Sequence, residues 1–235
     1  MATAIPARRA MYDQIVSQPA LLLEVLEQAQ HRVHTTLAHF QAQRWQAIYT
    51  AGCGDSFYAG LACEMAFARF CRLPVKALPA MSFARYEAAN LPEHSVVFGI
   101  SNSGAVSRSI EAIAMARAAG ADTIAVTAHE TSPITREAAG VLALPIASMG
   151  RSPGIRSYTV QLLTLLLCAL RIGEIRQVLS PAQADTWRQR LRVVAACMEA
   201  TIQAHDALTQ QIADQLRDAE NWVFVGAGPS YATAL

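Results

Sequence analysis

Ser95-Val96-Val97-Phe98-Gly99-Ile100, followed by Ser101-Asn102-Ser103-Gly104, is the stretch that decides the fold: an apolar run leads into a loop of small polar residues. A second stretch has the same form, with Ala47–Ala51 leading into Gly52-Cys53-Gly54-Asp55-Ser56. Each run is typical of a buried strand, and each loop opens into a helical pattern. Glycine lets the backbone approach a ligand closely, and the first N–H groups of a helix are unpaired. Both loops therefore favour an anion, most simply a phosphate.

Strands and helices alternate outward from these two stretches. Apolar strands separated by helices indicate a parallel sheet covered on both faces. The fold class is therefore α/β, a three-layer α/β/α sandwich with a five-stranded parallel sheet. Ligands of such sheets bind at the carboxyl ends of the strands, where both loops fall. We expect strands at 47–51, 75–78, 95–100, 122–127 and 141–144, and helices at 57–71, at 107–119 and from Ser132-Pro133.

The flanking segments read as helices. Residues 1–44 form a helical lead-in, and residues 45–175 hold the sheet domain, which ends in an apolar helix over 157–171. A connecting helix covers most of 176–219 and begins at Ser180-Pro181.

The last sixteen residues repeat the beginning of the sheet domain. Asn221–Val225 predicts a strand, and Gly226-Ala227-Gly228-Pro229-Ser230-Tyr231 repeats the Gly-x-Gly-x-Ser-aromatic pattern of residues 52–57. We interpret 220–235 as the first strand and glycine loop of an incomplete second copy, at which the chain is truncated. A lone strand cannot form a domain, so this tail pairs with the existing sheet, pairs with another chain or stays disordered.

Composition narrows the function. The chain has 235 residues, of which 53% are hydrophobic and 16% charged, and its net charge is +1. Such a balance gives no electrostatic case for nucleic acid or an anionic membrane as a partner. The apolar block Leu162–Leu170 is too short to span a bilayer. Five scattered cysteines without a C-x-x-C pair predict a reducing cytoplasm and neither a zinc site nor a disulfide framework.

Nucleotide cofactors are not expected. Phe57 replaces the third glycine of a dinucleotide fingerprint, and the strand ending at Leu78 lacks the acidic residue that would hold a ribose. A nicotinamide-dependent oxidoreductase is therefore disfavoured. Cys53 could be a nucleophile, although a small buried residue is the better interpretation. Arg151 and Arg156 either close over an anion or belong to a solvated loop.

The chain resembles the sugar isomerase (SIS) family, whose fold is flavodoxin-like, and in particular its double-domain type. That type includes the isomerase half of glucosamine-6-phosphate synthase and related sugar-phosphate deaminase/isomerases. The resemblance spans residues 11–235 with its motifs in matching order. They are Met11–Pro19, Gly52–Ser56, Ser82–Tyr86, Ser101–Gly104, Arg156–Leu162 and Gly226–Tyr231.

The resemblance implies a binding site for a hexose 6-phosphate or an amino-sugar phosphate. Its phosphate and hydroxyls would be bound by the two loops, through the residues Gly54, Asp55, Ser56, Ser101, Asn102, Ser103, Gly104 and Ser107. Three departures matter. Val106 replaces a threonine hydroxyl that Ser107 could supply, Asp55 stands where threonine is common, and Gly154-Ile155 replaces a Ser-Thr pair.

No catalytic residue is assigned in this chain. In the double-domain enzymes the base, the ring-opening histidine and a lysine come from the second domain. The resemblance thus implies the N-terminal half of an aldose–ketose sugar-phosphate isomerase or deaminase, of the amino-sugar or fructosamine phosphate type. The alternative is a non-catalytic module that binds or senses a phosphosugar. A homodimer is expected, because the apolar helix and the unfinished second copy leave surface to cover.

Overall fold

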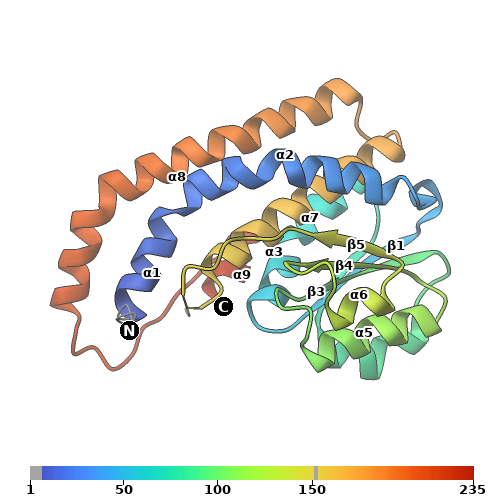
Figure 1. The fold of residues 1–235 in the computed structure, drawn as a ribbon, viewed down its shortest axis with the longest axis horizontal. Coiled ribbons are helices and arrows are strands. Elements are labelled where there is room, and N and C mark those ends of the chain that lie inside the picture. The colour runs from blue at the N-terminus through green and yellow to red at the C-terminus, as the bar shows by residue number, and fades with distance from the viewer. Residues whose placement is uncertain (1–6, 151–152) are drawn as a thin grey trace.

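The computed structural model describes residues 7–150 and 153–235, and it arranges them in three layers (Figure 1). The central layer is a parallel sheet of five strands in the order β2-β1-β3-β4-β5. The predicted fold class is confirmed, and the strands at 95–100 and 122–127 have the predicted bounds. The strands are β1 (Ala47–Gly52), β2 (Val75–Pro79), β3 (Ser95–Ile100), β4 (Asp122–Thr127) and β5 (Gly140–Ala143).

Alternate strand residues feed two hydrophobic cores, because successive side chains of a strand point to opposite faces. Ile48, Phe98 and Ile124 belong to the core beneath α2 (Gln18–Leu37), α3 (Asp55–Cys71) and α7 (Ile155–Ile175). Tyr49, Val97 and Ala125 belong to the core on the other face. That face is covered by α4 (Ala80–Ser82), a π-helical turn (Phe83–Glu87), α5 (Ser107–Ala118) and α6 (Pro133–Glu137).

The order of the strands reverses between β1 and β3. Helix α3 follows β1 onto one face of the sheet, while α5 follows β3 onto the other. The two connections therefore diverge and leave a crevice at the carboxyl ends of β1 and β3, which is where ligands of doubly wound sheets bind. Both glycine- and serine-rich loops lie at this point.

Helix α7 is the most apolar helix in the described part of the chain. By length and composition it could cross a membrane, but 61% of its most apolar window is buried inside the protein. It packs between α2 and α3 in the larger core. Its composition is that of a helix surrounded by protein.

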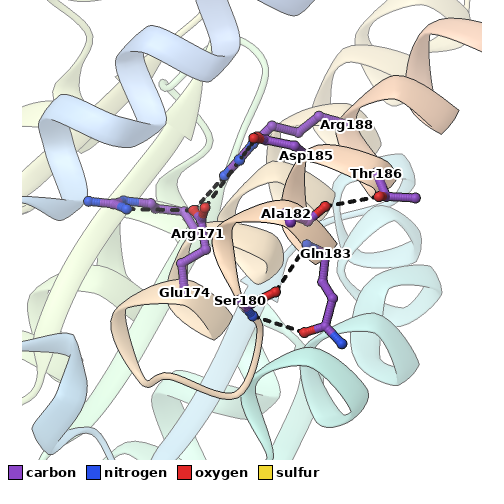
Figure 2. Close-up of polar contacts among 8 residues, drawn as sticks. All are labelled: Arg171, Glu174, Ser180, Ala182, Gln183, Asp185, Thr186 and Arg188. Carbon is purple, nitrogen blue, oxygen red and sulfur yellow. Dashed lines mark hydrogen bonds and ion pairs between the residues drawn. The ribbon is translucent and has the colours of Figure 1, made fainter.

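An ion-pair cluster fixes the junction between α7 and α8 (Pro181–Gln215), as Figure 2 shows. Glu174 pairs with Arg171 at 3.5 Å and with Arg188, and Arg188 also reaches Asp185 at 2.7 Å. The predicted helix start at Ser180 is confirmed: Ser180 and Gln183 cap each other reciprocally. Helix α8 then runs along α2, and beyond Ala195 almost all of its residues are exposed.

The predicted strand at 221–225 is not formed. Residues 219–228 follow α8 without a helix or strand, and Val223 and Val225 are 86% and 89% exposed. A strand requires a hydrogen-bonded neighbour, and among the described residues none lies alongside this segment. The segment ends in a short helix, α9 (Pro229–Ala234), which packs on α3 and buries Ala232. The N-terminal helix α1 (Ala7–Val16) contacts α2 and α7.

Candidate functional site

A cavity of about 580 Å³ opens at the carboxyl ends of β1, β3 and β4. Its walls come from the loops after these strands, from the segment 145–150, from the first turns of α7 and from α1. The lining residues are Gln14, Cys53, Asp55, Ser56, Asn102, Ala128, His129, Pro145, Ile146, Ala147, Ser148, Met149, Gly150, Pro153, Gly154, Arg156, Ser157 and Gln161.

The loop after β1 brings the start of α3 to this cavity. Gly54 precedes the helix with φ +54°, a conformation that side-chain-bearing residues rarely adopt. At Gly52 a Cβ would lie 2.7 Å from the backbone carbon of Ser56, so the turn closes only with glycine. Asp55 is the first residue of α3, and both Asp55 and the buried Ser56 line the cavity. Gly54 shapes this wall without lining it.

The loop after β3 supplies the second wall. Ser101 is buried and its hydroxyl has no hydrogen-bond partner in the described part of the chain. The next residue, Asn102, lines the cavity, and its carbonyl accepts hydrogen bonds from the Ala128 amide at 2.9 Å and the Thr127 hydroxyl at 3.1 Å. These bonds tie the loops after β3 and β4 together.

Ser101 does not itself line the cavity, and neither do the remaining loop residues predicted for the site. Ser103 is exposed, and its hydroxyl accepts a hydrogen bond from the Ala105 amide at 3.2 Å. Gly104 has φ +62°, and a Cβ there would meet the Ser132 hydroxyl at 2.0 Å. Ser107 is the exposed first residue of α5. Their part in ligand binding stays a prediction.

Helix α7 contributes the third wall and a buried cation. Arg156 is only 8% exposed, and its Nη1 donates to the Ala147 carbonyl at 2.6 Å. Its Nε, like Oε1 of the buried Gln161, has no partner among the described residues. Buried polar groups are nearly always paired, so two unpaired groups on one cavity indicate a site that a polar ligand completes. Arg151 lies outside the described residues.

Most of the lining residues were not predicted as site residues from the sequence, among them Gln14, His129 and Gln161. Gln14 reaches the cavity from α1 and donates to the Gly150 carbonyl at 3.4 Å. His129 follows β4, and Gln161 lies in the second turn of α7. Gln14 and Gln161 lie within two motifs of the family resemblance, Met11–Pro19 and Arg156–Leu162, whereas no motif contained His129.

The lining chemistry suits a small polar molecule. Cys53 lines the cavity, where the Ser109 hydroxyl contacts its sulfur at 3.9 Å. Across residues 7–150 and 153–235, histidine, cysteine and carboxylate side chains form no group of three that could hold a metal.

Residues 43–171, more than half of the chain, match the family of SIS domains. The chain belongs to the SIS family. Its SIS domain coincides with the sheet and with all three strand ends that build the cavity.

Relatives and solved structures agree with this assignment. The chain is 29% identical over 238 residues to the glutamine–fructose-6-phosphate aminotransferase (isomerizing) of Bradyrhizobium diazoefficiens, and 27% identical over 235 residues to that of Zymomonas mobilis. Each alignment covers 97% of this chain but 38% of the relative. This SIS chain therefore spans well under half the length of the curated proteins it matches.

The fold is shared with longer SIS structures. The C-terminal domain of glucosamine-fructose-6-phosphate aminotransferase from Francisella tularensis superposes with a TM-score of 0.82 at 18% identity, covering 96% of this chain and 64% of that one. Glucosamine-6-phosphate deaminase from Thermotoga maritima superposes with a TM-score of 0.68 at 19% identity, covering 92% and 64%. At these identities the likeness concerns the fold alone.

Proposed function

We propose that this SIS domain binds a hexose 6-phosphate or an amino-sugar phosphate in the cavity at the β1/β3 switch point. One observation carries the proposal: Arg156 Nε and Gln161 Oε1 on the cavity wall are buried without a partner among the described residues, and so is Ser101 Oγ, next to the lining residue Asn102. An unpaired buried polar group costs about 1–3 kcal/mol, and a phosphosugar offers acceptors and donors that satisfy such groups.

In this proposal, the two parts of the ligand bind at different walls of the site. The phosphate lies at the loop after β3, near Ser101 and Asn102, with Ser56 at its side. The sugar hydroxyls lie toward α7 and the segment 145–150. The relatives named for fructose 6-phosphate support this ligand class.

The reaction that we propose is carried by a larger assembly. This chain supplies the ligand-binding half of an aldose–ketose sugar-phosphate isomerase or deaminase of the amino-sugar or fructosamine phosphate type. Aldose–ketose isomerisation needs a base within hydrogen-bond reach of the migrating proton. We assign that base to a second SIS domain, of which residues 220–235 are the start. We further propose that the assembly is a cytoplasmic homodimer.

Binding tests the proposal through two serines of one strand and its loop. Ser95, at the amino end of β3, is buried and its hydroxyl donates to the Pro92 carbonyl at 2.7 Å. Ser101, at the carboxyl end, is buried, and no described residue hydrogen-bonds its hydroxyl. Calorimetric titration with fructose 6-phosphate should show Ser101→Ala weakening binding about tenfold, the loss of roughly one hydrogen bond to a charged group.

Ser95→Ala is the matched control and should keep the wild-type affinity for fructose 6-phosphate. Fructose and inorganic phosphate, given separately, should bind far more weakly than the ester. An affinity that is unchanged in Ser101→Ala, or no binding by the wild type, would refute the proposal.

Turnover separates the enzyme from a binding module that senses a phosphosugar. Binding without turnover, with activity restored by a chain that carries a second SIS domain, supports the enzyme half. Binding that no added domain converts into turnover supports the sensing module.

A further inference from the structure

Two side chains of opposite charge line the described part of the cavity. Asp55 begins α3 on one wall, and Arg156 lies in the first turn of α7. The guanidinium is buried and held by the Ala147 carbonyl, whereas Asp55 is exposed to the cavity. His129 is the other ionisable side chain on these walls, apart from the Cys53 thiol.

The Asp55 carboxylate has a fixed position. Its Oδ2 accepts a hydrogen bond from the Gly154 amide at 3.1 Å, and Gly154 is the residue that caps the start of α7. A Cβ at position 154 would lie 2.2 Å from that oxygen, so any larger residue there would displace the carboxylate. Asp55 thus joins the N-terminal ends of two helices, and both helix dipoles stabilise its negative charge there.

The negative charge of Asp55 repels some groups of a bound ligand and attracts others. A phosphate dianion is repelled from Asp55 and is left with the loop after β3. A protonated amine is attracted, because its positive charge adds a Coulomb attraction to the hydrogen bond with the carboxylate. A neutral hydroxyl can donate to the same carboxylate but lacks that attraction.

From this geometry we infer that Asp55 determines specificity: it selects phosphosugars that carry a protonated amine over those that carry a hydroxyl at the same carbon. The inference rests on the proposed function and adds to it the residue that distinguishes the two classes of substrate. The Gly154 contact keeps one carboxylate oxygen turned to the protein and sets the direction from which the amine is approached.

Glucosamine 6-phosphate and glucose 6-phosphate, which differ only at C2, are the probes. Calorimetry on the whole chain should give an affinity about tenfold higher for the amine. N-acetylglucosamine 6-phosphate, which keeps the nitrogen without its charge, should lose that advantage. In Asp55→Asn and Asp55→Thr the two sugars should bind within about twofold of each other.

Glu93→Gln is the matched control, because it removes one exposed carboxylate before β3, at the opposite edge of the sheet. It should keep the wild-type preference. Glucose 6-phosphate must still bind the Asp55 variants, which shows that their cavity is intact.

Equal affinities in the wild type, a preference that persists in both Asp55 variants, or variants that bind neither sugar would overturn the inference while leaving sugar-phosphate binding in place. A wild-type chain that binds neither sugar would overturn the proposed function as well.

Discussion

Two segments of this chain contain the same kind of glycine turn, but the residues before the two turns fold differently. Gly54 and Gly228 occupy the same position in the pattern Gly-x-Gly-x-Ser-aromatic, and their φ and ψ angles are 54° and −130° in the first case and 57° and −136° in the second. In both turns a Cβ on the first glycine would collide with the backbone of the serine four residues later. The turn is therefore set by local sequence.

The segments that precede the two turns have different structures. Residues 47–52 form β1, every residue of which is buried between β2 and β3. Residues 221–225 form no strand, although Trp222 and Phe224 stack on one side, as alternate residues of an extended chain do. An extended apolar segment becomes a strand only when a neighbour supplies its hydrogen bonds, and that neighbour is not encoded locally.

The largest expected difference is in amide hydrogen exchange. The amides of Ile48–Ala51 should be protected at least about a thousandfold, because they open only with the whole sheet. Those of residues 222–225 should exchange at nearly the unprotected rate, since none makes a backbone hydrogen bond to the described residues. Mass spectrometry of exchanged peptides measures both.

Concentration distinguishes the explanations of a different outcome. Protection of 222–225 that disappears on dilution would show that the segment pairs with a second copy of the chain. Protection that persists on dilution would contradict the exposed segment described above.

The next largest effect is a difference in stability between substitutions of the first glycine in each turn, Gly52 and Gly226. Gly52→Ala should destabilise the domain by about 3 kcal/mol, because its Cβ meets the backbone of Ser56 and Phe57 in the first turn of α3. Neither that turn nor the buried strand can shift to relieve the contact. Gly226→Ala, whose Cβ meets the Ser230 carbonyl at 2.3 Å, should cost less than about 0.5 kcal/mol, since the exposed segment relaxes. Urea unfolding followed by circular dichroism gives both values. Equal losses would mean that the second turn is as firmly embedded as the first.

The same distinction explains how far the fold could be predicted. Apolar runs bounded by turn residues placed β3 and β4 correctly, and Ser180-Pro181 marked the start of α8, because these signals are local. The strand at 221–225 had an equally good local signal and failed. The sequence pattern does not show which segment, if any, a strand will pair with.

The site shows the same limit. Ser56 and Asn102 were predicted because a short motif carries them, and they line the cavity. Ser107, predicted on the same basis, starts α5 away from it. Gln14 and Gln161 were missed because helices far from the loops in sequence bring them to the cavity.

A smaller effect should appear at alkaline pH. Burial raises the pKa of the thiols of Cys63 and Cys71 to about 12 from an ordinary value of 9.0, and it also raises the pKa of Cys168 well above 9.0. These thiols lie in the interface of α3 with α7, and α9 has none. An acid whose pKa is raised by folding stabilises the folded state fully below its unfolded pKa, so stability should fall between about pH 9 and 12.

The expected loss between pH 8 and pH 10 is about 1 kcal/mol for each buried thiol. Cys63→Ala should flatten this slope, whereas Cys197→Ala, which removes an exposed thiol, should leave it unchanged. Urea titrations at each pH measure the slopes. A slope that is identical in the three proteins would show that the buried thiols do not titrate with unfolding.

The smallest effect concerns the residue two positions before the first glycine. Thr50 in β1 is buried, its hydroxyl has no hydrogen-bond partner within the described part of the chain, and it faces Gly60 of α3, where a Cβ would lie 2.3 Å from that oxygen. Thr50→Val keeps the shape and removes the unpaired group, so stability should rise by up to about 1 kcal/mol. Thr164→Val is the matched control: this buried hydroxyl donates to the Val160 carbonyl at 2.7 Å, and its removal should not stabilise the protein. At the equivalent position of the second segment stands Phe224, which is exposed, so the strand–helix contact made by Thr50 and Gly60 has no counterpart there. If Thr50→Val proved destabilising, the hydroxyl would have to serve a function in β1 that compensates for its burial.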